Sequence, residues 1–515
     1  MKNTLLLLLL CVLCVSTFAA CAHTHSYTAA APVEASCAVG AYVRYTCTCG
    51  DFYDEETAPA LGHVMTKTEG IAVTCDSDGR PEYYTCSRCE KYYADERGST
   101  ELAESELVIP AGHRTTHHPS REPLRFEDGN WEYWQCNSCS KIFLNDTCTW
   151  EATLEEVTIT SAFNMVDFAV EVEEGRDPVI LQLTDPQFSN VTEMEERAYK
   201  YMRETILATK PDLILVTGDL VYGKYDHDGI AFSSFIDFME SFGIPWAPVF
   251  GNHDNESDIG VDWQCAQLEA AEHCLFKQGD LTGNGNYTVG IAQGERLSRV
   301  FYMLDSNGCS APGTASVGKV RAGIGFGEDQ LAWVREGVER LYESEPGVKI
   351  SLAFHIQLSV FSEAMNRYQE YFKYYTDTIN RVYPKLWLDK FDGTKNGDFG
   401  IIGCAPTEAI DKDKKVWNMI QSLGIDSVFV GHEHCNNFSI VYEGVRLQYG
   451  MKSTGYDSYN WIKDGKMGSG WHNNGWNAPA GATPLIGGSV LTMGADGSFK
   501  GGYIYLCGEI PEYNP

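Results

Sequence analysis

The sequence is poor in basic residues relative to acidic ones. Its 515 residues contain 39 Lys and Arg against 71 Asp and Glu, which leaves a formal net charge of −32 at pH 7. Proteins that bind nucleic acid neutralise phosphate groups with clustered Lys and Arg, so this deficit argues against that class of partner. We therefore expect no nucleic acid among its ligands.

Long apolar runs are also absent beyond the first twenty residues. A membrane-spanning helix needs about 20 consecutive apolar residues, so we expect no transmembrane helix. At the N-terminus, Lys2 precedes an apolar stretch over residues 5–15, and small residues follow around Ala20. This pattern is typical of an export signal over residues 1–20. We expect an extracytoplasmic protein, either secreted or held at the cell surface by a lipid anchor on Cys21.

The composition is typical of a folded protein. Hydrophobic residues make up 43% of the chain and aromatic residues 12%, which is too much core-forming material for a disordered chain. The length permits more than one domain. We expect a Cys-rich region over residues 21–150, a linker over residues 151–177 and a second folded region over residues 178–515.

Cysteines are concentrated in the first of these regions. Of the 18 cysteines, nine lie between residues 37 and 148 and six lie beyond residue 260. The first group belongs to a short repeat in which a Gly stands seven residues before the first Cys of a close pair. The three sets are Gly40, Cys47 and Cys49, then Gly79, Cys86 and Cys89, then Gly129, Cys136 and Cys139.

The first two repeats carry further thiol and imidazole groups. Each has an upstream Cys, Cys37 or Cys75, and each ends in a Gly-His pair that contributes His63 or His113. Three thiols and one imidazole could complete a tetrahedral zinc site, and we expect one structural zinc ion for each intact repeat. Disulfide bonds, natural for an exported chain, and free thiols are the alternatives. The third repeat lacks the upstream Cys, and the first has a C-x-C pair.

From residue 178 onward, apolar runs alternate with amphipathic stretches. The apolar runs predict buried strands at Val179–Leu183, Leu213–Val216, Trp246–Phe250, Val300–Leu304, Ile350–Phe354 and Ser427–Val430. Apolar spacings of three and four predict helices at Met194–Leu207, Ile230–Phe242 and Gln330–Tyr342. Such alternation is typical of layered α/β folds, whose functional groups collect at the carboxyl ends of the strands.

A narrow set of polar side chains follows five of these strands. They are Asp185, Asp219, Asn252, His355 and the pair His432 and His434. We expect these loops to meet at one edge of one sheet. Oxygen and imidazole ligands in this mixture suit two transition-metal ions that share a carboxylate. The sequence therefore predicts a dinuclear metal centre.

The order of these motifs resembles that of the calcineurin-like metallophosphoesterase superfamily, which includes the purple acid phosphatases. The resemblance covers about residues 178–455 and is carried by strings such as Gly251-Asn252-His253-Asp254 and Gly431-His432-Glu433-His434. It implies an α/β fold, a layered metallophosphoesterase-type β-sandwich flanked by helices, preceded here by the N-terminal Cys-rich small-repeat region. The repeats themselves resemble Cys-containing repeats of bacterial surface proteins, which implies a stalk or a binding role.

Carried over residue by residue, the resemblance implies two transition-metal ions, Fe, Mn or Zn, in the catalytic site. Asp219 would bridge both ions, and Asp185 and His434 would hold the first. The second ion would be held by Asn252, His355 and His432. His253 would face the substrate, where it would protonate the leaving oxygen or stabilise charge on the phosphoryl group.

The chain departs from the family at the first motif. Most members have Asp-x-His there, whereas this chain has Gln187 in the place of the His. A Gln can ligate only through its neutral amide oxygen, so we expect the first metal to bind less tightly or to be a different ion. Tyr222 stands three residues after Asp219, as in the Gly-Asp-x-x-Tyr motif by which purple acid phosphatases hold ferric iron, and it is the other candidate for the missing ligand.

We expect a hydrolase with a dinuclear metal centre that cleaves small phosphate esters by attack of metal-bound hydroxide. The residue types leave monoesters and diesters open as substrates. The alternative is a surface binding protein whose hydrolase domain is degenerate and inactive, and the missing His of the first motif favours that alternative.

Overall fold

The computed structural model describes residues 24–189, 192–308, 325–372, 399–400, 409–411, 414–454, 460–464, 466–469 and 481–508. The expected export signal and Cys21 lie outside these ranges. Within them, none of the helices combines the length and the apolar character needed to cross a bilayer. The chain divides into two compact units, one with residues up to 118 and 133–154, the other with residues 119–132 and 155–515.

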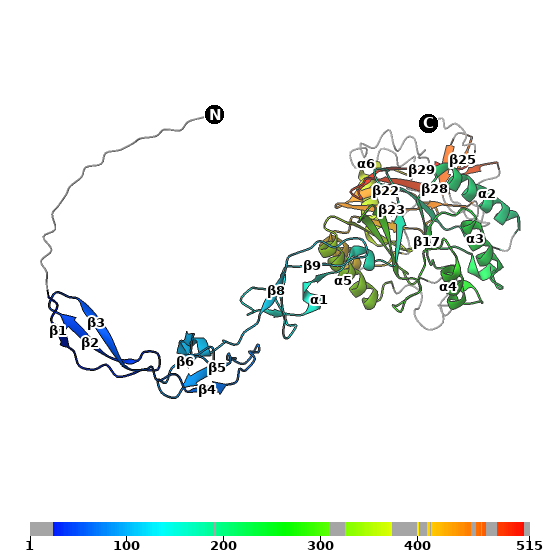
Figure 1. The fold of residues 1–515 in the computed structure, drawn as a ribbon. Coiled ribbons are helices and arrows are strands. Elements are labelled where there is room, and N and C mark those ends of the chain that lie inside the picture. Colours follow the sequence, from blue (N-terminus) through cyan, green and yellow to red (C-terminus); the bar gives the residue numbers. More distant parts are fainter. Residues whose placement is uncertain are drawn as a thin grey trace, which may run out of the picture. The chain divides into compact units, whose positions relative to one another are not determined.

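The first unit consists of small antiparallel sheets, one for each sequence repeat (Figure 1). The first holds β1 (Tyr27–Ala29), β2 (Ala41–Cys47) and β3 (Phe52–Ala58). The second holds β4 (Met65–Thr68), β5 (Tyr83–Cys86), β6 (Tyr92–Tyr93) and β7 (Glu101–Leu102). The third holds β8 (Thr115–His118), β10 (Tyr133–Cys136), β11 (Ile142–Phe143) and β12 (Glu151–Ala152). In each repeat, one strand ends at the first Cys of the pair.

Each repeat also places one aromatic residue opposite another on neighbouring strands. Such cross-strand aromatic pairs stabilise an antiparallel pair by up to about 1 kcal/mol and help to fix its register. The three pairs are Tyr45 with Tyr53, Tyr84 with Tyr93, and Trp134 with Phe143. The structure therefore reproduces the periodicity of the sequence.

The second unit contains two larger sheets. The six-stranded sheet runs in the order β17 (Trp246–Val249), β16 (Leu213–Thr217), β15 (Val179–Thr184), β28 (Gly487–Met493) and β29 (Phe499–Leu506), and β24 (Met451–Lys452) also pairs with β15. The seven-stranded sheet runs in the order β14 (Phe168–Glu171), β18 (Tyr287–Gln293), β19 (Arg296–Met303), β20 (Lys349–Ala353), β21 (Ser427–Val430), β23 (Val445–Tyr449) and β22 (Ser439–Tyr442).

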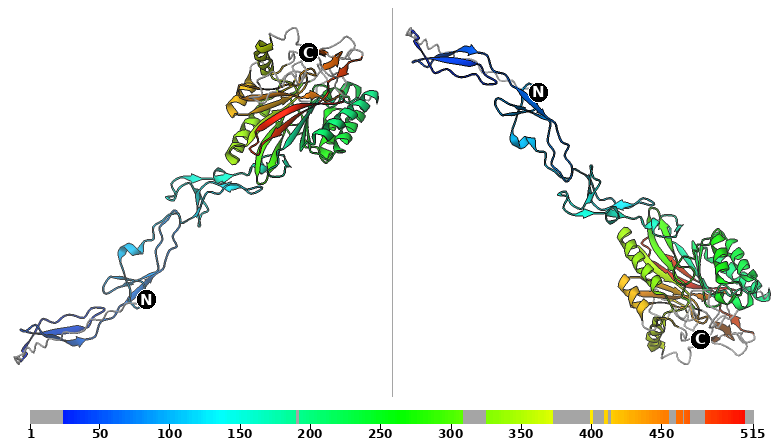
Figure 2. Two further views of the ribbon diagram at one scale, coloured as in Figure 1. Left: turned by 90° about the horizontal axis from the view of Figure 1, so that it is seen from above. Right: turned by 90° about the horizontal axis from the view of Figure 1, so that it is seen from below.

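Helices flank the two sheets on opposite sides, as Figures 1 and 2 show. Helices α2 (Thr192–Thr209), α3 (Ile230–Glu240) and α4 (Val261–Ala270) share one hydrophobic core with the six-stranded sheet and one face of the seven-stranded sheet. Helices α5 (Glu328–Ser344), α6 (Val360–Phe372) and α8 (Lys415–Leu423) pack in a second core on the other face of the seven-stranded sheet. The expected layered α/β sandwich is confirmed, together with the strands and helices predicted for it.

The segment expected to be a linker, residues 151–177, is structured. Residues 151–154 belong to the first unit, where β12 joins the sheet of the third repeat, and residues 155–177 belong to the second unit. Its strand β14 pairs in parallel with β18 at the edge of the seven-stranded sheet. Val170 and Val172 are buried in the core that both sheets share. Their alternation with exposed Glu residues is the signature of a half-buried edge strand, which the acidic composition of the segment obscures.

Candidate metal centre

The predicted ligands converge where the carboxyl ends of strands from both sheets meet. Asp185, Asp219 and Asn252 follow the parallel strands β15, β16 and β17 of the six-stranded sheet. His355 follows β20, and His432 and His434 follow β21, in the seven-stranded sheet. The expectation of one edge of one sheet is therefore wrong, because the chain crosses to a second sheet between the third and fourth motifs.

Asp185 and His434 form one half of the centre. Asp185 Oδ1 lies 3.2 Å from His434 Nε2. Its other oxygen, Oδ2, accepts hydrogen bonds from the His432 backbone N–H at 3.0 Å and from the Thr184 hydroxyl at 2.7 Å. The buried Oδ1 makes no well-aligned hydrogen bond among the described residues, although His434 Nε2 lies beside it. A buried carboxylate oxygen without a donor costs free energy unless a cation occupies the position that it faces.

Asn252, His355 and His432 form the other half. Asn252 Oδ1 lies 3.0 Å from His355 Nε2 and 2.7 Å from His432 Nδ1. His355 Nδ1 lies 2.7 Å from the Thr217 carbonyl oxygen. Because a carbonyl only accepts, Nδ1 carries the proton of a neutral His355, which leaves Nε2 as the ligand atom that faces the centre.

Asp219 lies between the two halves. Its Oδ2 is 3.4 Å from His355 Nε2, and the same His355 atom is 4.0 Å from Asp185 Oδ1. The inward-facing atoms of Asp185, Asp219 and His355 all lie within 4.8 Å of one another, and all three side chains are buried. This spacing would permit a carboxylate to be shared by two cations. The bridging role of Asp219 stays a prediction.

The charged groups of the centre shift one another's pKa values. Burial raises the pKa of Asp219, but the neighbouring His355 and His253 lower it well below its ordinary value. Burial lowers the pKa of His355, whereas Asp219 and Asp185 raise it to about 10. Two buried carboxylates thus hold a proton on His355. Metal cations would supply the same balancing charge, which is consistent with the oxygen and imidazole donor set.

The loops approach one another so closely that only glycine fits at some positions. A Cβ atom at Gly218 would lie 2.4 Å from His355 Nδ1, and one at Gly251 would lie 2.2 Å from Asp219 Oδ1. Asp185 and Asp219 themselves adopt positive φ values of 51° and 53°. Strained backbone of this kind persists where the surrounding structure fixes it, and it is common at functional sites.

His253, which we predict to face the substrate, lies beside the centre. Its backbone N–H donates to Asp219 Oδ1 at 2.8 Å, and its Nδ1 lies 2.8 Å from Glu256 Oε2. Burial lowers the pKa of His253, but Asp219 and Glu256 raise it above its ordinary value. Glu256 therefore orients the ring and favours its protonated form.

Gln187 lies next to Asp219, but its amide oxygen contacts a residue that the motifs did not reveal. Gln187 Oε1 accepts a hydrogen bond from Lys452 Nζ at 2.8 Å, and Gln187 Nε2 donates to Asp219 Oδ2 at 3.3 Å. Lys452 is buried and also donates to the Asp185 carbonyl oxygen. A buried ammonium thus stands next to the position of the missing imidazole.

Tyr222, the other candidate for the missing ligand, stacks on His253 with ring centroids 4.3 Å apart. Its hydroxyl oxygen accepts a hydrogen bond from Lys224 Nζ at 3.1 Å. The ring therefore forms one wall beside His253, and its oxygen already has a cationic partner.

Comparisons with known proteins find relatives named as probable inactive purple acid phosphatases and a relative named as a phosphatase. The chain is 26% identical over 309 residues to a protein named probable inactive purple acid phosphatase 28 from Arabidopsis thaliana, covering 53% of this chain and 67% of that protein. It is 24% identical over 314 residues to probable inactive purple acid phosphatase 29 from the same plant, covering 54% and 72%. Phosphatase DCR2 of Saccharomyces cerevisiae is 22% identical over 253 residues, covering 47% and 39%.

Solved structures give distant similarities. GAP50, the anchor in the inner membrane complex of Plasmodium, matches with a TM-score of 0.35 and 10% identity over 66% of this chain and 91% of that chain. A purple acid phosphatase from yellow lupin seeds matches with a TM-score of 0.32 and 8% identity over 90% and 78%. The sequence profile of the calcineurin-like phosphoesterase family matches residues 178–436, about half of this chain and the part that carries all the loops of the centre. The chain therefore belongs to the calcineurin-like phosphoesterase family.

Proposed function

We propose that this protein hydrolyses small phosphate esters at a dinuclear metal centre. The observation that carries the proposal is the convergence of Asp185, Asp219 and His355, whose inward-facing atoms lie within 4.8 Å of one another. Two bound cations would neutralise phosphoryl oxygens and lower the pKa of a water molecule held between them.

The predicted ligands would bind the two cations in separate groups. Asp219 would bridge the cations, Asp185 and His434 would hold one, and Asn252 with the two histidines that it contacts would hold the other. Gln187 would complete the first site only through an amide oxygen that it shares with Lys452. We therefore propose a first site of lower affinity, because a buried ammonium opposes a nearby metal cation.

His253 would supply the proton that the leaving oxygen needs. Glu256 holds its Nδ1 and would fix the orientation of the ring that donates the proton. Removing a positioned general acid lowers turnover about 10²- to 10⁴-fold. His253→Ala should therefore lose turnover on that scale while the metal content of the protein stays unchanged.

The second candidate is a binding protein with an inactive hydrolase domain. Gln187 in place of the family's His and the adjacent Lys452 favour it. Retention of the other ligand types at one point of the structure favours the enzyme. The two differ in a simple assay of the full chain with chromogenic phosphomonoesters and bis-esters, with Mn²⁺, Zn²⁺ or iron added.

The hydrolase predicts turnover that follows metal content and disappears in Asp219→Ala, which removes the bridging carboxylate. If the folded protein, fully loaded with metal, cleaves none of these esters, the hydrolase proposal fails and the inactive binding protein is favoured. Comparing monoesters with bis-esters also decides which class the centre prefers.

We further propose that the mature protein lies outside the cytoplasm. The basic and then apolar pattern over residues 1–20, with Cys21 directly after it, supports this location. Mass spectrometry of the mature N-terminus separates the two forms. A lipid-modified Cys21 indicates a surface lipoprotein, whereas an unmodified cleaved terminus indicates secretion, and an intact Met1 would contradict both.

A further inference from the structure

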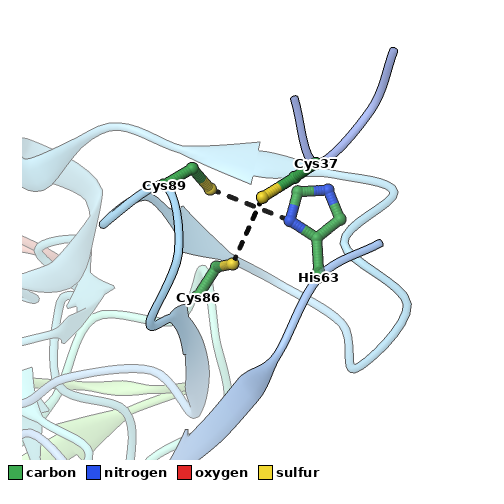
Figure 3. Close-up of side chains that lie close together, drawn as sticks. All are labelled: Cys37, His63, Cys86 and Cys89. Atoms are coloured by element: carbon green, nitrogen blue, oxygen red, sulfur yellow. Dashed lines mark hydrogen bonds between the residues drawn. The ribbon is translucent and has the colours of Figure 1, made fainter. Parts of the chain in front are cut away.

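Three clusters of Cys and His side chains lie in the repeats, far in sequence from the metal centre. We call them the sulfur sites. The first holds His25, Cys47 and Cys49, the second Cys37, His63, Cys86 and Cys89, and the third Cys75, His113, Cys136 and Cys139. In each, the candidate ligand atoms lie within 4.8 Å of one another. Figure 3 shows the second site, where three sulfurs and one imidazole nitrogen face a common point.

The distances in these sites fit tetrahedral zinc. With Zn–S near 2.3 Å and Zn–N near 2.0 Å, two sulfurs on one ion lie about 3.8 Å apart, and a sulfur and a nitrogen about 3.5 Å. Cys37 Sγ and Cys86 Sγ are 3.8 Å apart, and Cys75 Sγ and Cys136 Sγ are 3.5 Å apart. A disulfide needs sulfurs about 2.05 Å apart, so neither pair has the geometry of one.

The imidazole enters each site in the same way. His Nδ1 faces the second Cys of the pair at 3.3 Å for His25, at 3.8 Å for His63 and at 3.4 Å for His113. The ring of His63 packs on Tyr93 with centroids 4.7 Å apart, and the ring of His113 packs on Phe143 at 4.5 Å. Such support fixes the orientation of a ligand, as surrounding residues do in known metal sites.

The ligand sets straddle consecutive repeats. The second site takes its His and its Cys pair from residues 63–89, but its fourth ligand, Cys37, comes from the preceding repeat. The third site repeats this pattern with Cys75. Cys37 stands twelve residues after His25, and Cys75 stands twelve residues after His63. Each intact repeat therefore contributes one Cys ligand to the site of the following repeat. This contradicts our expectation that each intact repeat holds a zinc ion of its own.

The last repeat has a different residue at the donor position. Twelve residues after His113 stands Arg125, whose guanidinium forms an ion pair with Glu171 and lies over the Phe163 ring. No fourth Cys pair follows that could receive a thiolate. The last repeat therefore has no following site to which a Cys could contribute a ligand. The change from Cys to Arg at this position fits a series in which each repeat supplies one ligand to the next.

The repeats offer little other material to hold them together. The buried members of the hydrophobic cluster at the second site are Cys37, Cys86 and Tyr93, with Met65, Tyr84 and Cys89 partly buried against them, so the candidate ligands themselves form much of the core. Units of this size commonly need a metal or disulfides to fold. Binding free energy of a structural zinc ion then becomes folding free energy.

We propose that the second and third sulfur sites bind structural zinc and that each ion joins two consecutive repeats. The first sulfur site, with three ligands among the described residues, binds zinc more weakly. Metal binding therefore keeps the repeat region folded as a whole, and loss of one ion breaks the connection between two neighbouring repeats. This proposal is independent of the proposed hydrolase activity.

Cobalt(II) titration of the reduced, metal-free full chain tests the ligand sets. Thiolate-to-cobalt charge-transfer absorption reports the sulfur sites alone, because the candidate ligands of the catalytic centre contain no sulfur. Cys37→Ser and Cys86→Ser should each remove one site's share of the absorption, and the double variant should remove no more than either alone. Cys37→Ser combined with Cys136→Ser should remove the shares of two sites. Cys148→Ser, which changes a thiol of the same region outside the sites, should change nothing.

Two results would overturn the proposal. One is the absence of thiolate absorption in the wild-type chain. The other is a loss of absorption in the Cys37→Ser, Cys86→Ser double variant that equals the sum of the two single losses. Such a sum would place the two residues in different sites, because the effects of substitutions at independent sites add.

A measurement on the wild-type chain avoids variants that fail to fold. After zinc loading, alkylation read by mass spectrometry should spare Cys37, Cys86 and Cys89, while Cys148 reacts. After treatment with a chelator, all four should react. Equal alkylation of Cys37 before and after the chelator would overturn the proposal.

Discussion

At the residue scale, the pairing of His253 with Glu256 determines the expected pH profile. Glu256 raises the pKa of His253, and the acid form is the one that donates a proton. Activity should therefore fall as the pH rises through that pKa. Glu256→Gln removes the charge, lowers the pKa and should move the alkaline limb of kcat/KM to lower pH by about 1 pH unit.

The matched control is His227, whose Nδ1 lies 2.8 Å from Asp258 Oδ2 in an exposed pair. Asp258→Asn removes an equivalent charge from a histidine that lies outside the predicted site, so it should leave the profile unchanged. An alkaline limb that stays in place in Glu256→Gln would show that another group supplies the proton.

Gln187 gives a second test at this scale. Its amide oxygen contacts Lys452, so the first metal site lacks a strong ligand. Gln187→His supplies the imidazole common in the family and should tighten binding of the more weakly held ion on the order of 10-fold. Isothermal titration with Mn²⁺ measures this. Unchanged affinity of the weaker ion would mean that Lys452, and not the missing imidazole, limits binding.

At the element scale, the loops after β16 and β17 depend on glycine. Gly218→Ala should weaken metal binding and activity, because its φ is +92° and its Cβ would lie 2.4 Å from His355 Nδ1. The backbone strain alone costs about 1–3 kcal/mol. Gly347→Ala separates the two effects, since Gly347 has a φ of +98° and nothing within 4 Å of a Cβ.

Both variants should unfold at lower temperature than the wild type, as differential scanning calorimetry would show. Only Gly218→Ala should also lose metal and turnover. Equal metal loss in the two variants would mean that the close contact between the new Cβ and His355 does not affect metal binding.

The sequence was most informative where local pattern and local structure coincide. The apolar runs predicted the strands, and the polar residues at their ends predicted the convergence of Asp185, Asp219 and His355. Lys452 escaped detection because it reaches Gln187 only through the parallel pairing of β24 with β15, far along the chain. The pairing of Cys37 with Cys86 escaped for the same reason, since a ligand's partner depends on how repeats pack. Which sheet each strand joins is likewise a tertiary property.

At the scale of the whole molecule, the net charge of −32 bears on the substrate. Like charges slow the encounter of an acidic protein with a highly anionic ester, and salt screens this repulsion. The kcat/KM for a polyanionic ester should therefore rise with ionic strength, whereas that for a singly charged bis-ester should change little. A fall for the polyanion would instead indicate a local basic surface that attracts it.

The proposed activity depends on two cations that lie between the loops of the two sheets. Anomalous diffraction from crystals of the full chain loaded with Mn²⁺ tests it directly. We expect two peaks, one on each side of the Asp219 carboxylate, with the weaker peak beside Asp185 and His434. No peak at Asp219, in crystals of protein that hydrolyses phosphate esters, would contradict it.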